Sequence, residues 1–427
     1  MSIILQPKKL NGSVHVPPSK SMAHRAIICA SLARGKSVIR NIEFSKDIDA
    51  TIQAMKALGT MIFKYDDYLE IDGTTTFFKN NCEIDCCESG STLRFMIPIS
   101  LICEANVHFI GEGRLGKRPL DVYYRIFDQQ GIGYLYKENV LDLYIRGQLH
   151  GGTFQIPGDV SSQFISGLLF ALPLMDEDSK IEITSPLESK GYIDLTLQML
   201  KLYGVEIINQ DYQVFIIKGG QEYQPYDYEV EADFSQAAFY LVAGALQNSV
   251  VLKGLNVGSY QGDKVAIDFL KKMGCQLICV KEGYRVNAQG LVAIDIDGTQ
   301  CPDIIPIIAL ACALAKGKSY IRNISRLRIK ECDRLKATVE VINQLGGKAW
   351  EYDDYMVIEG VQQLVGGEVS SYNDHRMAMM GAIASTVCQK DVIIDNKECV
   401  SKSYPSFWEH FAMLGGVYNE LDMGNKH

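Results

Sequence analysis

The sequence predicts a two-lobed α/β protein built from six copies of one unit of about 70 residues. The segment LARGKSVIRNI (residues 32–42) returns as LAKGKSYIRNI (residues 314–324), with 9 of 11 positions identical. A glycine also closes an apolar-periodic helical segment six times, at spacings of 72, 73, 70, 72 and 69 residues: Gly59, Gly131, Gly204, Gly274, Gly346 and Gly415. Because a unit of this length buries one face and needs neighbours to cover it, the copies should pack in groups.

The first copy shows the elements expected in every unit. AIICASLA (residues 26–33) predicts a helix and SVIRNI (37–42) a strand. DIDATIQAMKALG (47–59) predicts a second, amphipathic helix, which Gly59 ends in the position that suits a left-handed cap. MIFKY (61–65) and YLEIDG (68–73) predict a pair of strands. Each unit should therefore contain two helices and several short strands.

The chain is too long for one hydrophobic core, since single cores stop growing near roughly 250 to 300 residues. Two lobes of three units are the natural division. The polar, tyrosine-rich stretch Gly219–Asp233 lies at the midpoint and is the best linker candidate, with the crossing near Tyr228. We expect residues 1–17 to supply the first strand of lobe 1, residues 18–228 to form lobe 2, and residues 229–427 to form the remainder of lobe 1.

Composition excludes several classes of partner. A net charge of -9 and a pI near 5.4 argue against a nucleic-acid or anionic membrane surface, either of which needs a broad basic patch. The longest apolar run, IIPIIALACALA (304–315), is too short to span a bilayer and contains Pro306, and the N-terminus lacks the regions of a signal peptide. We expect a cytoplasmic monomer that binds neither nucleic acid nor membrane.

The twelve cysteines are expected to be reduced and mostly buried, because the chain is long and carries no secretion signal. No CxxC pair occurs, and the seven histidines show no HxxxH spacing beside an acid. The sequence therefore predicts neither a metal site nor a cofactor.

Polar residues gather at the predicted helix starts. The first helices of the six units begin PSKSMAHR, ESGSTLRF, DVSSQFIS, ADFSQAAF, CPDIIPII and NDHRMAMM, and the second helices begin SKDIDATI, GRLGKRPLDV, ESKGYIDL, YQGDKVAI, RIKECDRL and SKSYPSFW. A helix N-terminus has unpaired N–H groups and the positive end of the dipole, so it attracts anions. Eight cations lie at these starts: Lys20, Arg25, Arg94, Arg118, Lys330, Arg334, Arg376 and Lys402.

Any one of these cations, taken alone, is better explained as a solvated surface charge or a helix cap than as a ligand contact. Eight of them in register with the repeat instead indicate a binding cleft for anions, since arginine pairs bidentately with phosphate and carboxylate and lysine adds a point charge. Ser161 and Ser162 are plain N-cap candidates that, with Gln163, also suit a phosphate oxygen. If the repeats point their helix starts one way, the two lobes face each other across this cleft.

One motif gives a false lead. GEGRLGKR (residues 111–118) matches GxGxxG and is one residue short of a GxxxxGK[ST] phosphate loop. Arg118 replaces the hydroxyl that would hold magnesium, and Pro119 starts the following helix, so we do not expect a nucleotide site.

Nine motifs in family order now point to a known family: PSKSMAHR, SGSTLR, the RP of GKRP, DVSSQF, ESKGYIDLT, PDIIP, RIKECDR, YNDHRMAM and SKSYP. Over essentially its whole length the chain resembles the 5-enolpyruvylshikimate 3-phosphate synthase family. The resemblance implies two inverted α/β-barrel-like lobes, each of three βαβαββ-type units, with the active-site cleft between them. It also implies transfer of the enolpyruvyl group of phosphoenolpyruvate to the 5-hydroxyl of shikimate 3-phosphate, without a cofactor.

The resemblance also implies roles for individual residues. Shikimate 3-phosphate would contact Lys20, Ser21, Arg25, Ser161, Ser162, Ser189, Asp303 and Lys330. Phosphoenolpyruvate would contact Lys20, Arg94, Arg118, Gln163, Arg334, Arg376 and Lys402, and Gly90 would leave room beside it. Asp303 is the expected base at the hydroxyl, and either Glu331 or Lys20 would protonate the methylene carbon.

Some positions depart from the family's commoner pattern. Glu88, Ser91 and Phe95 stand where many relatives carry Asn, Thr and Pro, and Arg326 stands where some have Asn. These differences affect the expected response to glyphosate, the family's inhibitor, and not the expected reaction.

Two alternatives compete with this reading. The related UDP-N-acetylglucosamine enolpyruvyl transferases normally have Lys-Asn where this chain has Lys20-Ser21, and a reactive Cys in the loop that here reads GEGRLGKRP. A non-catalytic repeat scaffold would not need Asp303 and Glu331 among eight cations.

Overall fold

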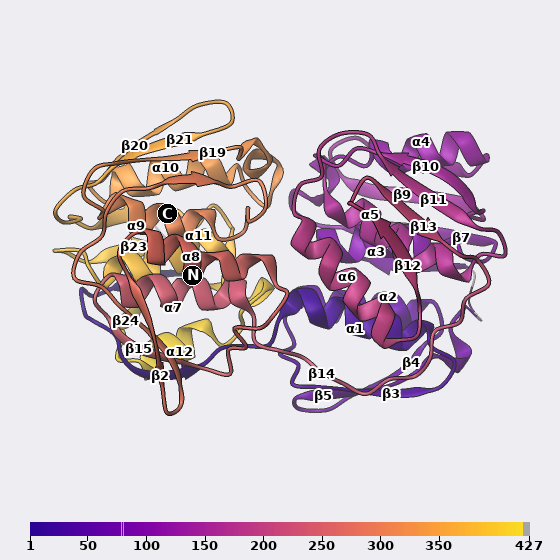
Figure 1. Ribbon diagram of the computed structural model, residues 1–427, viewed down its shortest axis with the longest axis horizontal. Coiled ribbons are helices and arrows are strands. Elements are labelled where there is room, and N and C mark those ends of the chain that lie inside the picture. The colour runs from indigo at the N-terminus through magenta and orange to yellow at the C-terminus, as the bar shows by residue number, and fades with distance from the viewer. Residues whose placement is uncertain (78, 80, 422–427) are drawn as a thin grey trace, which may run out of the picture. The chain divides into compact units, whose positions relative to one another are not determined.

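The computed structural model describes residues 1–77, 79 and 81–421. The chain separates into two compact units: unit 1 (Met1–Pro17 and Glu231–His427), equivalent to the expected lobe 1, and unit 2 (Pro18–Val230), equivalent to lobe 2. In Figure 1 the labels of unit 2 run from α1 to β14, and those of unit 1 include both chain ends. The second boundary follows the strand β14 (Tyr228–Glu229), which pairs with a strand of unit 2.

Unit 2 contains three successive repeats. The first has α1 (Lys20–Leu32), β3 (Lys36–Arg40), α2 (Lys46–Ala57), β4 (Met61–Lys64) and β5 (Tyr68–Asp72). The second has β6 (Asn81–Asp85), α3 (Gly90–Ser100), β7 (Ala105–Gly111), α4 (Asp121–Gln130), β8 (Gly133–Tyr136) and β9 (Leu141–Gly147). The third has β10 (Gly152–Ile156), α5 (Ser162–Ala171), β11 (Ser179–Ile183), α6 (Lys190–Leu202), β12 (Ile207–Gln210) and β13 (Val214–Ile217).

Unit 1 contains the other three repeats. The fourth has α7 (Phe234–Ala245), β15 (Ser249–Lys253), α8 (Val265–Lys272), β16 (Gln276–Val280) and β17 (Gly283–Asn287). The fifth has β18 (Asp295–Asp297), α9 (Ile305–Ala313), β19 (Lys318–Arg322), α10 (Arg334–Gln344), β20 (Lys348–Glu351) and β21 (Met356–Glu359). The sixth has β22 (Gly367–Val369), α11 (His375–Ser385), β23 (Val392–Ile394), α12 (Phe407–Met413) and β24 (Tyr418–Leu421).

Each repeat forms one four-stranded sheet, which confirms the expected repeated unit. In the third repeat the strand order is β10-β11-β13-β12, with β10 parallel to β11 and the other two pairs antiparallel. The second and fifth repeats have the same order, β6-β7-β9-β8 and β18-β19-β21-β20. In the described part of the chain the six sheets stay separate, and none closes into a barrel.

Strand exchange completes the remaining three sheets. Residues 1–17 hold two strands, β1 (Ser2–Leu5) and β2 (Asn11–His15), where one was expected. β1 is antiparallel to both β23 and β24, and in the sheet of the sixth repeat it has the position that β13 has in the third repeat. β2 is parallel to β15 in the fourth repeat, and β14 is parallel to β3 in the first repeat. Both have the position that β10 has in the third repeat. In Figure 1 the indigo β2 lies next to β15.

The first helix of each repeat is enclosed and the second is amphipathic. All twelve residues of α7, all nine of α9 and all eleven of α11 are buried, as are residues 22–32 of α1. In the second helices only one face is buried. Because an all-round apolar helix needs cover on every side, the enclosed helices form the centre of each hydrophobic core.

The six glycines that set the sequence period have the predicted role. All six have positive φ, between 70° at Gly131 and 109° at Gly59. Each ends a second helix, and glycine adopts this left-handed conformation without steric cost. The repeat read from the sequence is therefore a repeat of helix ends.

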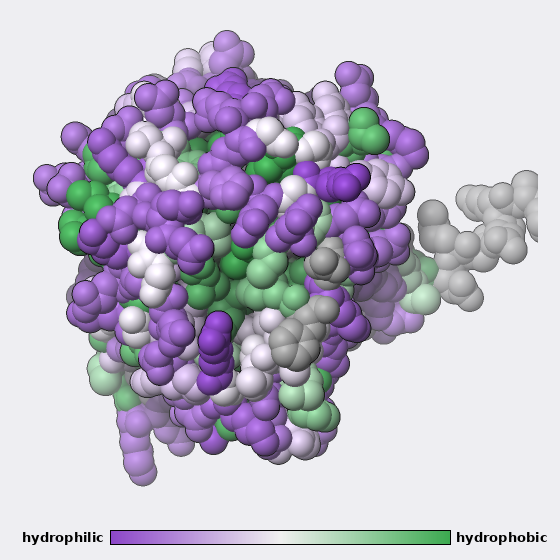
Figure 2. All heavy atoms as spheres, turned by 90° about the vertical axis from the view of Figure 1, so that its right-hand side faces the viewer, coloured by the Kyte–Doolittle hydropathy of each residue, from purple (hydrophilic) through white to green (hydrophobic). Residues whose placement is uncertain are grey.

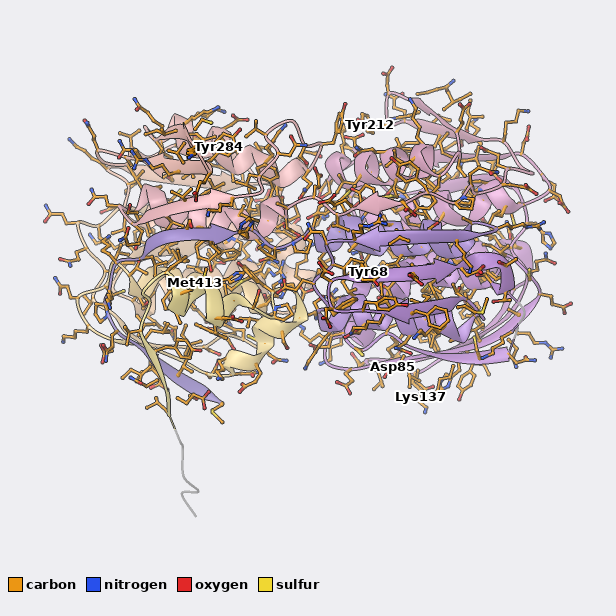
Figure 3. The ribbon with its side chains drawn as sticks, turned by 90° about the horizontal axis from the view of Figure 1, so that it is seen from below. Tyr68, Asp85, Lys137, Tyr212, Tyr284 and Met413 are labelled. Carbon is orange, nitrogen blue, oxygen red and sulfur yellow. The ribbon has the colours of Figure 1, made fainter. Side chains whose placement is uncertain are left out.

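Hydrophilic side chains cover most of the face of unit 2 seen in Figure 2, with a hydrophobic area near its centre. Figure 3 shows neighbouring strands of the same unit from below, with Tyr68 on β5 among them and Asp85 and Lys137 near the outer edge.

Among residues 1–77, 79 and 81–421, no helix has the length and apolar character needed to cross a membrane.

Candidate active site

In unit 2 the start of α1 carries a lysine that is paired with an acid. Ser19 caps the helix and accepts from the Met22 N–H at 3.4 Å. Lys20 Nζ lies 2.7 Å from Asp47 Oδ2 on α2, and the Lys20 side chain is 19% exposed. A cation at a helix N-terminus is unfavourable to the dipole, and Asp47 offsets this repulsion. The pair holds a positive charge beside unsatisfied backbone donors, which suits an anionic ligand.

Arg25, one turn further along α1, is held by three hydrogen bonds. Its Nε donates to Thr196 Oγ1 at 2.8 Å, Nη1 to the Ser21 carbonyl at 2.7 Å and Nη2 to the Tyr192 carbonyl at 2.9 Å. Burial lowers the pKa of Arg25 to about 10. The guanidinium is still charged at neutral pH, and its position is fixed by α1 and α6.

Three side chains meet around Gly90, the first residue of α3. Arg94 Nη1 donates to Gln163 Oε1 at 2.9 Å, and Gln163 Nε2 donates to Ser91 Oγ at 2.9 Å. A Cβ on Gly90 would lie 2.5 Å from Arg118 Nη1 and 3.1 Å from Arg94 Nη1. Glycine is therefore needed here for close approach, and two guanidinium groups converge on one helix start. We call Gly90, Arg94, Arg118 and Gln163 the arginine cradle.

The predicted serines lie at the starts of α5 and α6. Ser161 caps α5 by accepting from the Gln163 N–H at 3.3 Å, and Ser162 is buried at the first helical position. Ser189, immediately before α6, is buried and has a φ of 57°. A left-handed conformation is costly for a residue other than glycine, and such strain often marks functional positions. The three hydroxyls lie at two helix starts that carry none of the eight predicted cations.

In unit 1 one buried arginine joins three carboxylates. The Arg334 side chain is 2% exposed, and its Nη1 donates to Asp303 Oδ1 at 2.8 Å. Its Nη2 donates to Glu331 Oε2 at 2.6 Å, and its Nε to Asp374 Oδ2 at 2.7 Å. Burial alone would lower the pKa of Arg334, yet these carboxylates raise it well above its usual value. Asp374 also caps α11, accepting from the Arg376 N–H at 2.8 Å.

Three further cations surround the same carboxylates. Lys330 Nζ lies 3.5 Å and Arg376 Nη2 3.4 Å from the Asp303 carboxylate, and Lys402 Nζ lies 3.9 Å from Glu331 Oε1. Burial would raise the pKa of Asp303, but Lys330, Arg376 and Arg334 hold it well below its usual range. Burial lowers the pKa of Lys330 to about 8 against the opposing effect of Asp303. Asp303 is thus an ionised carboxylate enclosed by positive charge.

The structure brings the predicted residues together in two groups, one in each unit. Unit 2 gathers the arginine cradle, while Lys20 and Arg25 start the same helix but bond to different partners. Unit 1 gathers all six of its predicted residues through the shared carboxylates: Asp303, Lys330, Glu331, Arg334, Arg376 and Lys402.

Sequence reasoning missed three acids near the cations. Asp47 pairs with Lys20 and Asp374 with Arg334, while the Asp263 carboxylate accepts from Ser235 Oγ. Burial and the neighbouring Asp303 raise the pKa of Asp263 to about 6. All three acids lie at helix starts in the sequence, so counting carboxylates there as well as cations would have found them.

The loop at residues 111–118 does not form a phosphate-binding turn before a helix. β7 ends at Gly111, a short 3-10 turn covers Leu115–Lys117, and α4 begins only at Asp121. Arg118 instead belongs to the arginine cradle. Among the residues that the structure describes, no group of three or more His, Cys, Asp or Glu side chains could hold a metal ion.

The fold and the two groups define an α/β protein of two three-repeat units with cationic side chains near helix starts. Comparison with known families matches residues 4–411 to the family described as EPSP synthase (3-phosphoshikimate 1-carboxyvinyltransferase). The chain therefore belongs to the EPSP synthase family.

Individual relatives agree with this assignment. The chain is 56% identical over 420 residues to a 3-phosphoshikimate 1-carboxyvinyltransferase of Clostridium perfringens (strain 13 / Type A), covering 98% of this chain and 99% of the relative. It is 52% identical over 436 residues to one of Clostridioides difficile (strain 630), covering 99% of each. A solved EPSP synthase from Acinetobacter baumannii is similar with a TM-score of 0.80 at 24% identity, covering 98% of this chain and 100% of the other. This structural likeness supports the fold.

Proposed function

We propose that this chain transfers the enolpyruvyl group of phosphoenolpyruvate to the 5-hydroxyl of shikimate 3-phosphate and releases phosphate. Relatives that cover 98% or more of the chain carry the corresponding name. The observation that carries the proposal is Asp303, an ionised carboxylate enclosed by Lys330, Arg334 and Arg376. A base among cations is what attack by a hydroxyl on an anionic phosphate ester requires.

The residues divide into an acceptor set and a donor set. Shikimate 3-phosphate takes Lys20, Ser21, Arg25, Ser161, Ser162, Ser189, Asp303 and Lys330, and phosphoenolpyruvate takes Lys20, the arginine cradle, Arg334, Arg376 and Lys402. The buried, hydrogen-bonded geometry of Arg25 supports its role as a fixed phosphate anchor. Each set contains residues of both units.

The reaction proceeds by addition and then elimination. Asp303 accepts the proton of the 5-hydroxyl while that oxygen attacks C2 of phosphoenolpyruvate, and C3 gains a proton from Glu331 or Lys20. In the tetrahedral intermediate the C2–O bond to phosphate then breaks. The methyl group returns one proton, the double bond re-forms, and inorganic phosphate leaves. The guanidinium groups stabilise the charge that develops on the departing phosphate.

Substrate binding also makes Asp303 a better base. Without ligand, Lys330, Arg376 and Arg334 hold its pKa well below the usual range, which makes it a weak proton acceptor. Anionic substrates bring negative charge to the same cations and so reduce their effect on Asp303. The pKa of Asp303 therefore rises when the substrates are bound.

Phosphate release from phosphoenolpyruvate tests the proposal. We expect release with shikimate 3-phosphate as acceptor and none with UDP-N-acetylglucosamine, and we expect the rate to survive EDTA. Release only with the nucleotide sugar would refute the assignment. We also propose that the chain acts as a cytoplasmic monomer; light scattering after gel filtration tests the monomer, and an oligomer at assay concentration would contradict it.

A further inference from the structure

A chain of buried, hydrogen-bonded side chains joins three helices of unit 2. His24 Nδ1 on α1 lies 2.7 Å from Thr51 Oγ1 on α2, which lies 2.8 Å from Thr92 Oγ1 on α3. Thr92 Oγ1 donates to Ser89 Oγ, the cap of α3, at 2.8 Å. All four side chains are almost fully buried. The chain contains none of the candidate site residues.

The single proton on each hydroxyl fixes the direction of this chain. Thr92 gives its proton either to Ser89 Oγ or to the Asp47 carbonyl, 3.5 Å away, and so has none for Thr51. Thr51 must donate to Thr92, which leaves Thr51 as the acceptor from His24. His24 therefore carries its proton on Nδ1. Its Nε2 is buried and finds no hydrogen-bond partner within the described part of the chain.

His24 is also uncharged. Burial lowers its pKa to about 3, with Lys20 and Arg25 acting in the same direction and Asp47 against it. The imidazole stays neutral at any pH at which the enzyme would be assayed. It supplies a fixed hydrogen-bond donor and does not transfer protons.

Two parallel contacts link α1 to α2 on one face. Lys20 and His24 are four residues apart on α1, as are Asp47 and Thr51 on α2, so each pair shares a helix face. Lys20 Nζ meets Asp47 Oδ2 at 2.7 Å, and His24 Nδ1 meets Thr51 Oγ1 at 2.7 Å. From Thr51 the second contact continues to the cap of α3, directly before the arginine cradle. The position of Lys20 is thereby tied to that of the cradle.

We propose that His24 is a positioning residue: its Nδ1–H bond to Thr51 fixes the start of α3 relative to Lys20. This inference deepens the proposed function and rests on it. Loss of the bond lets Gly90 and Arg94 shift away from the donor phosphate, while Arg25, held by Thr196 and by backbone carbonyls, stays in place. Loss of the bond should therefore lower kcat and kcat/KM for phosphoenolpyruvate more than it weakens the binding of shikimate 3-phosphate.

Four variants test this role in the full-length protein. The amide nitrogen of Asn occupies the place of the imidazole Nδ1, so His24→Asn keeps the donor, while His24→Leu removes it. Thr51→Val keeps the shape of the side chain and removes the hydroxyl. Ser31→Ala is the matched control, because the Ser31 hydroxyl is also buried on α1 and has no hydrogen-bond partner within the described residues. Wild-type turnover, measured first, decides the proposed function separately.

We expect His24→Leu and Thr51→Val each to lower kcat/KM for phosphoenolpyruvate by about tenfold or more, the order seen for small displacements of positioning groups. The Kd for shikimate 3-phosphate should change less than about threefold. His24→Asn and Ser31→Ala should stay near wild type, and the double variant of His24→Leu with Thr51→Val should lose less than the two single losses combined. Equal loss with His24→Asn and His24→Leu, or additive losses in the double variant, would overturn the proposal.

A spectroscopic measurement is independent of turnover. Nitrogen NMR of histidine-labelled wild type, with the His24 signal assigned from its absence in His24→Asn, should show protonation on Nδ1 alone and no titration between about pH 5 and 9. A proton on Nε2, or titration in that range, would exclude the hydrogen-bond direction on which the inference depends. If His24→Leu does not fold, Thr51→Val and this spectrum still decide the matter.

Discussion

Gly90→Ala should lower activity without lowering the stability of the fold. Gly90 begins α3 with a backbone conformation open to any residue, because its φ is not positive. Alanine favours a helix over glycine by roughly 0.5 to 1 kcal/mol, so this change alone should leave stability equal or slightly higher. The new Cβ would lie 2.5 Å from Arg118 Nη1, which is the mobile end of a long side chain. The protein can accommodate alanine by moving that guanidinium.

The size of the movement gives the expected loss. Ordinary contact begins near 3.4 Å, so Arg118 Nη1 must retreat by about 0.9 Å. A displacement of about 1 Å in a positioning group can cost on the order of 10² in rate. We therefore expect kcat/KM for phosphoenolpyruvate to fall by roughly 30- to 100-fold. Binding of shikimate 3-phosphate should be nearly unchanged.

The assay measures initial rates of phosphate release against phosphoenolpyruvate at saturating shikimate 3-phosphate, together with Tm by calorimetry. Gly133→Ala is the control, since Gly133 is exposed on β8 and its added Cβ would meet nothing closer than the Arg146 carbonyl at 3.6 Å. Arg118→Ala should add little to Gly90→Ala, because the larger clash of the new Cβ is with Arg118 and the one with Arg94 Nη1, at 3.1 Å, is smaller. A kcat/KM within twofold of wild type, or full additivity, would refute the reasoning.

Three further predictions concern unit 1. Asp303→Asn should keep substrate binding and lower kcat by on the order of 10² to 10⁴, and wild-type turnover would remove Asp303 from the mechanism. Arg334→Met leaves the carboxylates of Asp303, Glu331 and Asp374 buried together without their cation. The free energy of unfolding, measured in urea, should therefore fall by roughly 3 to 5 kcal/mol. A fall of less than about 1 kcal/mol would show that this charge cluster does not stabilise the fold. Lys330 is charged below its pKa of about 8 and neutral above it, so kcat/KM for shikimate 3-phosphate should fall as pH rises through that value. Lys330→Arg should abolish this alkaline limb, and a limb that persists would assign it to another group.

The repeat could be predicted from the sequence because it depends on local residue preferences. Gly59 and its five equivalents each end an amphipathic helix, and the glycine that a left-handed cap favours is recognisable without knowledge of the tertiary structure. The exchanged strands could not be predicted in this way. NGSVH, the sequence of β2, has one buried residue, and nothing in it says that its partner is β15, more than 230 residues later. Such pairing depends on the packing of all four strands of the sheet, which the local sequence of β2 does not show.

The candidate site was predictable to a similar extent. Cations in register with the repeat marked the helix starts, and the structure groups Arg94 with Arg118 in unit 2 and the four predicted cations of unit 1 around shared carboxylates. Their acid partners were not apparent, because spacing alone does not show that Asp374 both caps α11 and holds Arg334. The link from His24 to the start of α3 crosses three helices, and only tertiary packing creates it.

The exchanged strands impose an order on folding during synthesis. Unit 2 is continuous from Pro18 to Val230 and has all its strands once residue 230 has left the ribosome. β1 and β2 are synthesised before the strands with which they pair. β2 pairs with residues 249–253, and β1 pairs with residues 392–394 and 418–421. Unpaired strands of a nascent chain are exposed to wrong pairing and aggregation. Unit 1 can therefore complete its sheets only after residue 421 has been synthesised.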